Sequence, residues 1–188
     1  MYYKKILAAA LTVSCIGGIV PANSVQAASL KIRYSGKTRY YKGKQLHVSY
    51  ANKNLSSKYV GIQINKVNMI PYYDYLVKQG PKVKRTYSKS SGKLILKNGD
   101  DTLTAYVGKR TYYLNGIKKT FSVAPTKVKY YKTKKTIILI PANAIVKGLG
   151  LNYKYSSSSK RIYITQPVIP SDSTTQAQTQ PSGSVQYT

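Results

Sequence analysis

The alternation of apolar and polar positions is clearest between residues 136 and 165, where it predicts a strand followed by a short helix. Apolar, β-prone residues at 137–140 run into Pro141. Residues 142–147 then have helix-forming character and are followed by Gly148 and Gly150, since glycine suits the residue just past a helix C-terminus. Because proline lacks the N–H that the first helical position leaves unpaired, we expect Pro141 to begin the helix.

The segment after this helix predicts a β-hairpin. Residues 151–155 and 160–165 flank a run of serines at 156–159, which is the pattern of two strands joined by a polar turn. Successive side chains of a strand point to opposite faces, so Ile162 and Ile164 should share one face, and Arg161 and Tyr163 the other.

The same pattern occurs earlier in the chain. Pro71 precedes a helix expected over residues 72–78, a Gly-Pro pair follows it, and segments 82–87 and 93–97 predict a second hairpin. We therefore expect an internal duplication. The alternative is chance similarity within a composition rich in lysine and tyrosine.

The predicted fold class is α+β, with two tandem small units of mostly antiparallel strands and one short helix in each. The first, divergent unit covers residues 30–97 and the second covers residues 102–165. The polar segment between them contains Asn98-Gly99, a strong turn signal. Residues 166–188 are rich in Ser, Thr, Gln and Pro and are expected to form a flexible tail, because they cannot bury enough apolar surface to fold.

The N-terminus predicts a signal peptide over residues 1–27. Lys4 and Lys5 precede an apolar run at 6–13, and the small residues up to Ala27 suit signal peptidase. A retained membrane anchor is the alternative, but the unbroken apolar part is too short to span a bilayer. We expect a secreted, extracellular protein that can associate with the cell wall, without a transmembrane span in its mature form.

Cys15 is the only cysteine and lies inside the expected signal peptide. The exported chain should then contain no disulfide and rest on its apolar core. An alternative, left open, is that Cys15 is the acylated cysteine of a lipoprotein. The residues before it, Thr12 to Ser14, fit that processing site poorly.

The charge of the chain is strongly one-sided. The sequence has 31 Lys and Arg residues against four Asp and Glu, a net charge of +27. Without Lys4 and Lys5, 29 basic residues remain against the same four acids, so the mature net charge is +25. Such a balance concentrates polyanions near the protein. The 20 tyrosines, interleaved with lysine and arginine, should place some rings beneath cationic side chains.

The sequence lacks the residues that catalysis or metal binding usually requires. A transition-metal site needs several His, Cys or carboxylate ligands, whereas the mature chain offers one His, His47, and four Asp. Asp100 and Asp101 are adjacent in a turn and would diverge rather than flank a glycosidic bond. No Gly-x-Ser-x-Gly motif surrounds any serine. We expect no enzyme activity, no metal and no cofactor.

The densest basic segments are the candidate polyanion-binding residues. They are Lys82, Lys84, Arg85, Lys109, Arg110, Lys118, Lys119, Lys127, Lys129, Lys132, Lys134 and Lys135. On alternating strands many of them would line one solvent face, where neutralising phosphates releases counter-ions. The alternative is a solvated face without a particular partner.

Several motifs of the chain together indicate a family. They are Leu114-Asn115-Gly116, a strand ending at Val123-Ala124-Pro125, Ile138-Leu139-Ile140-Pro141 before a short helix, Gly150, and a hairpin ending at Arg161-Ile162-Tyr163-Ile164. In these residues the chain resembles the copper amine oxidase N-terminal-like domain, or stalk domain, of secreted proteins of Gram-positive bacteria. The resemblance covers roughly residues 30–165. It implies a small α+β domain without copper chemistry, because the metal ligands of amine oxidases belong to a separate catalytic domain.

The leading functional hypothesis is a secreted, non-catalytic module that binds anionic cell-envelope polymers, such as teichoic acids, through its basic, tyrosine-rich surface. The alternative is a structural or protein–protein interaction module of the cell surface whose partner is another secreted protein. Nucleic acid is a third candidate ligand, although no motif supports it.

Overall fold

The computed structural model describes residues 29–167. The expected signal peptide, with Cys15, and the expected tail from residue 168 onward lie outside these residues, so those expectations stay predictions. Between residues 29 and 167 no helix is long and apolar enough to cross a membrane.

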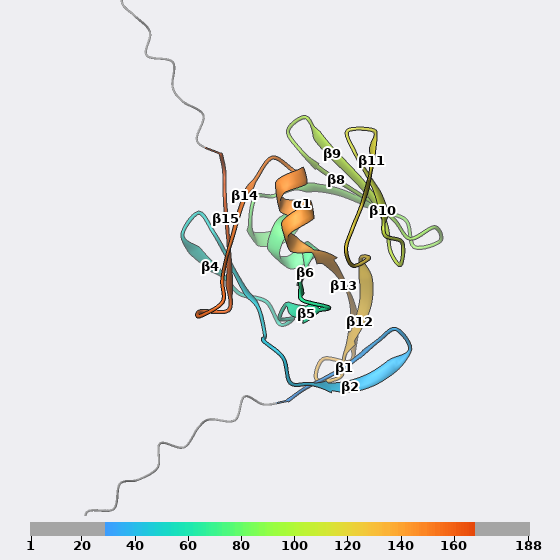
Figure 1. Ribbon diagram of the computed structural model, residues 1–188, viewed down its shortest axis with the longest axis vertical. Helices are drawn as coiled ribbons and strands as arrows, with labels where there is room; N and C mark the ends of the chain where they lie inside the picture. The colour runs from blue at the N-terminus through green and yellow to red at the C-terminus, as the bar shows by residue number, and fades with distance from the viewer. Residues whose placement is uncertain (1–28, 168–188) are drawn as a thin grey trace, which may run out of the picture.

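The described chain folds into three β-sheets and two short helices (Figure 1). The six-stranded sheet has the order β2 (Lys37–Tyr41), β1 (Leu30–Tyr34), β12 (Thr126–Tyr130), β13 (Lys135–Pro141), β6 (Val67–Pro71), β5 (Ile62–Ile64). The five-stranded sheet has the order β11 (Ile117–Thr120), β10 (Thr111–Leu114), β9 (Asp101–Tyr106), β8 (Lys93–Asn98), β7 (Lys84–Tyr87). The four-stranded sheet has the order β14 (Asn152–Ser156), β15 (Arg161–Thr165), β3 (His47–Tyr50), β4 (Lys53–Leu55). The helices are the π-helix η1 (Tyr73–Gln79) and the α-helix α1 (Ala142–Gly148).

The predicted α+β class is wrong, because the described residues are mostly β-structure. The two helices follow Pro71 and Pro141, as the pattern indicates, but each has only 7 residues.

All three sheets combine strands from both halves of the chain. The six-stranded sheet joins β6 to β13, the five-stranded sheet joins β8 to β9, and the four-stranded sheet joins β15 to β3 in parallel. The halves therefore share one fold and do not stand as two tandem units.

β6 pairs with β13 in the interior of the six-stranded sheet. Ile70 faces Ile140, and each strand ends at the proline that precedes a helix. Pro141 has an extended conformation, with φ −65° and ψ 105°, so it ends the strand and does not begin the helix as expected. Proline is tolerated at a strand end because the N–H that it lacks is not needed there.

Two hydrophobic clusters cover opposite faces of this strand pair. Ile70 and Ile140 pack into the larger cluster, which also contains Ile162 and Ile164. Met69 lies beside Ile70 in sequence but packs into the smaller cluster. This division follows from the alternation of side chains along a strand. Helix α1 lies inside the larger cluster, between β14 on one side and β9 on the other (Figure 1).

Buried tyrosines in both clusters make the fold sensitive to alkaline pH. Tyr75 is 1% exposed, and burial, reinforced by the charge of Asp74, raises the pKa of its phenol to about 12. Burial also raises the pKa of Tyr130, whose hydroxyl donates a hydrogen bond to the Val60 carbonyl at 2.6 Å. A pKa raised by folding favours the neutral phenol, so this stabilisation is complete below about pH 10, the pKa of an unfolded tyrosine, and declines as the pH rises toward 12.

We expect Tyr75→Phe to make the free energy of unfolding less dependent on pH between about 10 and 12. The slope of that free energy against pH should change by the equivalent of up to about one proton. The hydrogen bond from the Tyr75 hydroxyl to the Tyr59 carbonyl is long, at 3.5 Å, so phenylalanine should fit without a large loss. Chemical denaturation at a series of pH values measures the slope. Tyr113→Phe, at an exposed position, is the control, and equal slopes for the two variants would contradict the prediction.

Gly150, two residues after the end of α1, has a backbone conformation that few other residues adopt. Its φ is +69°, and a Cβ there would lie 2.6 Å from Oδ2 of Asp101. We expect Gly150→Ala to lower the free energy of unfolding by about 2 kcal/mol, through left-handed strain plus the clash. Gly99→Ala is the matched control, because Gly99 has φ +57° and nothing within 4 Å of the added Cβ. If denaturant titrations show the same loss of unfolding free energy for both variants, the contact with Asp101 does not contribute to the loss at Gly150.

Candidate anion-binding cleft

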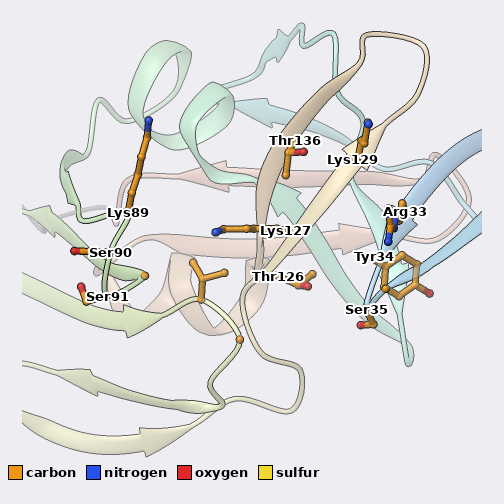
Figure 2. A pocket seen from close by; sticks show the side chains of 14 residues that line it. Arg33, Tyr34, Ser35, Lys89, Ser90, Ser91, Thr126, Lys127, Lys129 and Thr136 are labelled. Carbon is orange, nitrogen blue, oxygen red and sulfur yellow. The ribbon is translucent and has the colours of Figure 1, made fainter.

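An open cleft of about 680 Å³ lies between the six-stranded sheet and the turn that joins β7 to β8. Four cationic side chains line it: Arg33 from β1, Lys127 and Lys129 from β12, and Lys89 from the turn. Figure 2 shows Lys127 between Lys89 on one side and Arg33 on the other. The cleft therefore concentrates positive charge from three separate segments.

The register of β1 against β12 brings two of these cations together. Arg33 lies directly opposite Lys129 in the antiparallel pair. The neighbouring pair, Ile32 and Tyr130, is buried in the smaller cluster. Because side chains alternate along each strand, burying Ile32 and Tyr130 sends Arg33 and Lys129 to the solvent face.

The remainder of the lining is rich in hydroxyl groups and contains no acidic side chain. The hydroxyl-bearing residues other than Tyr34 are Ser35, Ser90, Ser91, Thr126 and Thr136. Cationic groups form short, strong hydrogen bonds with anionic oxygens, and hydroxyls can donate to the same oxygens. The cleft thus offers favourable contacts to phosphate, sulfate or carboxylate and no repulsive charge.

The acidic groups with hydrogen-bonding partners lie outside the cleft. Asp74, in the first turn of η1, accepts a hydrogen bond from the Ser57 hydroxyl. Asp101 accepts one from the Asn115 side chain at 3.0 Å. Both partners are neutral, so these contacts leave the cleft cations free of carboxylates.

The positive surface continues beyond the cleft along β1 and β12. The Lys31 ammonium lies 5.1 Å from the centre of the Tyr131 ring and 5.5 Å from that of Tyr40. Lys129 lies 5.5 Å from the Tyr131 ring, and the Thr38 hydroxyl lies 3.0 Å from the Tyr131 hydroxyl. The hydrogen bond with Thr38, together with the charge of Lys129 and its neighbours, lowers the pKa of Tyr131. Tyrosine and cationic side chains are interleaved here, as the composition predicts.

The twelve candidate residues lie in several places. Lys127 and Lys129 line the cleft. The others lie in the β12–β13 turn and the start of β13 (Lys132, Lys134, Lys135), on or before the edge strand β7 (Lys82, Lys84, Arg85), in the β9–β10 turn (Lys109, Arg110) and on the edge strand β11 (Lys118, Lys119). The fold therefore does not bring all twelve to one face, and their part in ligand binding stays a prediction.

The two arginines among the candidates outside the cleft make contacts with other residues of the fold. Arg85 stacks 4.8 Å from the Tyr73 ring and donates to the Tyr72 hydroxyl at 3.3 Å. Arg110 donates to the Phe121 carbonyl at 2.8 Å. These contacts give both arginines a structural role that a basic run in the sequence does not reveal.

Sequence reasoning missed two of the four cleft cations, Arg33 and Lys89. Arg33 belongs to an alternating Lys31-x-Arg33 pattern like that of Lys127-x-Lys129, which was a usable signal. Lys89 is flanked by serines in a turn, and no local pattern distinguishes it from other surface lysines. Its position in the cleft follows from how the sheets pack.

The described residues contain no group of three His, Cys, Asp or Glu side chains that could hold a metal ion. His47 is exposed at the start of β3 and pairs with Arg161 of β15. His47 is therefore a strand residue of the four-stranded sheet.

The fold and the cleft define a small, mostly β module with a basic surface groove. Residues 50–164 match the family model of the copper amine oxidase N-terminal domain, and the chain belongs to this family. That domain is the non-catalytic, stalk-like part of the amine oxidases. The matched region leaves out β1 and β2, so Arg33 comes from outside it. Neither curated proteins nor solved structures gave a match.

Proposed function

We propose that this chain is a secreted, non-catalytic module that binds anionic cell-envelope polymers of the teichoic acid type, as in Gram-positive bacteria. The observation that carries the proposal is the cleft lined by Arg33, Lys89, Lys127 and Lys129, with hydroxyl groups and without an acidic side chain. The net charge of +27 and the non-catalytic family support it. The N-terminal signal pattern supports export.

The charge of the described residues explains why such a ligand would also stabilise the fold. With 29 basic residues and three acids between residues 29 and 167, the folded state is opposed by self-repulsion. A polyanion neutralises part of this charge and releases its own counter-ions, which makes binding steeply dependent on salt.

Retention on purified cell walls tests the proposal. We expect the mature protein to bind walls that keep their anionic polymers and to be released by salt. Walls stripped of those polymers should retain much less protein. Equal retention on both preparations, or retention that salt does not change, would refute the proposal.

A protein–protein interaction module is the second candidate, and the edge strand β11 favours it. All four residues of β11 are exposed, and Ile117 is 65% exposed. An open strand edge can pair with a strand of another protein. Co-purification of one stoichiometric protein partner that survives high salt would support this second function.

A further inference from the structure

The cations along β1 and β12 form a ladder with a regular spacing. Lys127 occupies one level, Arg33 and Lys129 face each other at the next, and Lys31 occupies the third. The third level is fixed by the hydrogen bond from the Tyr131 amide to the Lys31 carbonyl at 3.1 Å. Consecutive levels are two residues apart, and a strand rises about 3.4 Å per residue, so the levels are spaced by about 6.8 Å.

This spacing selects among anionic polymers. In a chain of three-carbon polyol phosphates, a fixed number of covalent bonds separates consecutive phosphorus atoms. The same number of covalent bonds separates the Cα atoms of residues two apart in a strand. The two backbones therefore have similar repeats when extended, about 7 Å. A five-carbon polyol adds two bonds to each repeat, so its phosphates cannot stay in step with the ladder.

The aromatic rings beside the ladder do not favour nucleic acid. Proteins that bind single strands stack bases on open aromatic faces. The Tyr131 ring instead has Lys31 and Lys129 within 5.5 Å of its centre, and Arg39 lies 4.6 Å from the centre of the Tyr34 ring. The cleft offers hydroxyl groups where a base would need a flat surface, and these groups suit a polyol.

We infer that the ladder binds a linear phosphodiester of a three-carbon polyol, a glycerol phosphate polymer, with consecutive phosphates at Lys127, at Arg33 with Lys129, and at Lys31. Lys89, on the turn at the Lys127 end of the ladder, contacts the chain where it leaves β12. This inference rests on the proposed function and narrows its ligand to one repeat chemistry.

Calorimetric titration with defined oligomers of equal phosphate number tests the inference. We expect glycerol phosphate oligomers to bind the mature protein at least about tenfold more tightly than ribitol phosphate oligomers, the equivalent of about 1.4 kcal/mol. Affinity should rise steeply until the oligomer fills the three levels and more slowly beyond them. Equal affinity for the two kinds of polyol phosphate oligomer would overturn the inference. So would a single-stranded oligothymidylate that binds more tightly than the glycerol phosphate oligomer.

A matched pair of variants separates the ladder from overall charge. Arg33→Gln with Lys129→Gln removes two cations that face each other across an antiparallel pair. Lys84→Gln with Lys97→Gln removes two such cations from β7 and β8, away from the cleft. We expect the first variant to lose the preference for glycerol phosphate and the second to keep it.

The outcomes also separate this inference from the proposed function. Wall retention that depends on anionic polymers, without selectivity between polyols, would overturn the ladder and leave the proposed function standing. Retention independent of those polymers would overturn both.

Discussion

Replacing Lys127 and Lys129 by glutamine should weaken binding to anionic wall polymer by roughly 30-fold at moderate salt. Each lysine close to an anionic surface contributes about 1 kcal/mol, and the removal of two corresponds to that factor. The dependence of log affinity on log salt should also become shallower by about one unit for each phosphate that is no longer neutralised. Co-sedimentation with purified polymer over a salt series measures both quantities.

The control for this experiment removes the same amount of charge from a different place. Lys118→Gln with Lys119→Gln also removes two lysines from one strand, the exposed edge strand β11. We expect the control to bind within about threefold of the wild-type protein, because only the long-range field is reduced. If both double variants bind equally weakly, binding depends on total charge and the cleft has no special role.

Shortening Ile140 to alanine should lower the free energy of unfolding by about 3 to 4 kcal/mol. Its side chain is fully buried, and its removal leaves a cavity in the larger hydrophobic cluster, beside Ile70 on the neighbouring strand. Such a loss is a large part of the stability of an ordinary domain, so the variant should also unfold at a markedly lower temperature. Denaturant titration and thermal unfolding measure the two effects.

Graded and exposed substitutions test whether burial is the cause. Ile140→Val should cost about 1 kcal/mol, and Ile117→Ala, at an exposed position, less than about 0.5 kcal/mol. Because Ile70 and Ile140 face each other, the losses of Ile70→Ala and Ile140→Ala should not add in the double variant. Similar losses for Ile140→Ala and Ile117→Ala would show that burial of the Ile70–Ile140 pair does not stabilise the fold as described.

The features that sequence reasoning predicted correctly are local ones. The final hairpin, the shared face of Ile162 and Ile164 and the helices after Pro71 and Pro141 depend on alternation and on residues adjacent in sequence. The class of the fold depends on something else. β15 pairs with β14 of its own half, as the hairpin pattern predicts, and also with β3. The second pairing joins residues more than 100 positions apart in the sequence, and no local pattern contains it.

The same limit explains how much of the cleft was predictable. Lys127 and Lys129 belong to a dense basic segment that the sequence marks clearly. Arg33 joins them only because β1 pairs with β12, and Lys89 only because the β7–β8 turn packs across the sheet. Density of charge along the chain therefore identified one side of the cleft and could not identify the other.

The parallel pairing of β3 with β15 has a consequence for the order in which the molecule is assembled. β3 is synthesised early, whereas β15 ends at Thr165, near the end of the described chain. Until β15 is available, β3 has one pairing edge without its partner strand, and the larger hydrophobic cluster lacks Ile162 and Ile164. A chain released in an incomplete length would expose that edge to other chains. Folding should accordingly be slow, as long-range strand pairing requires, and should be completed only once β15 is available.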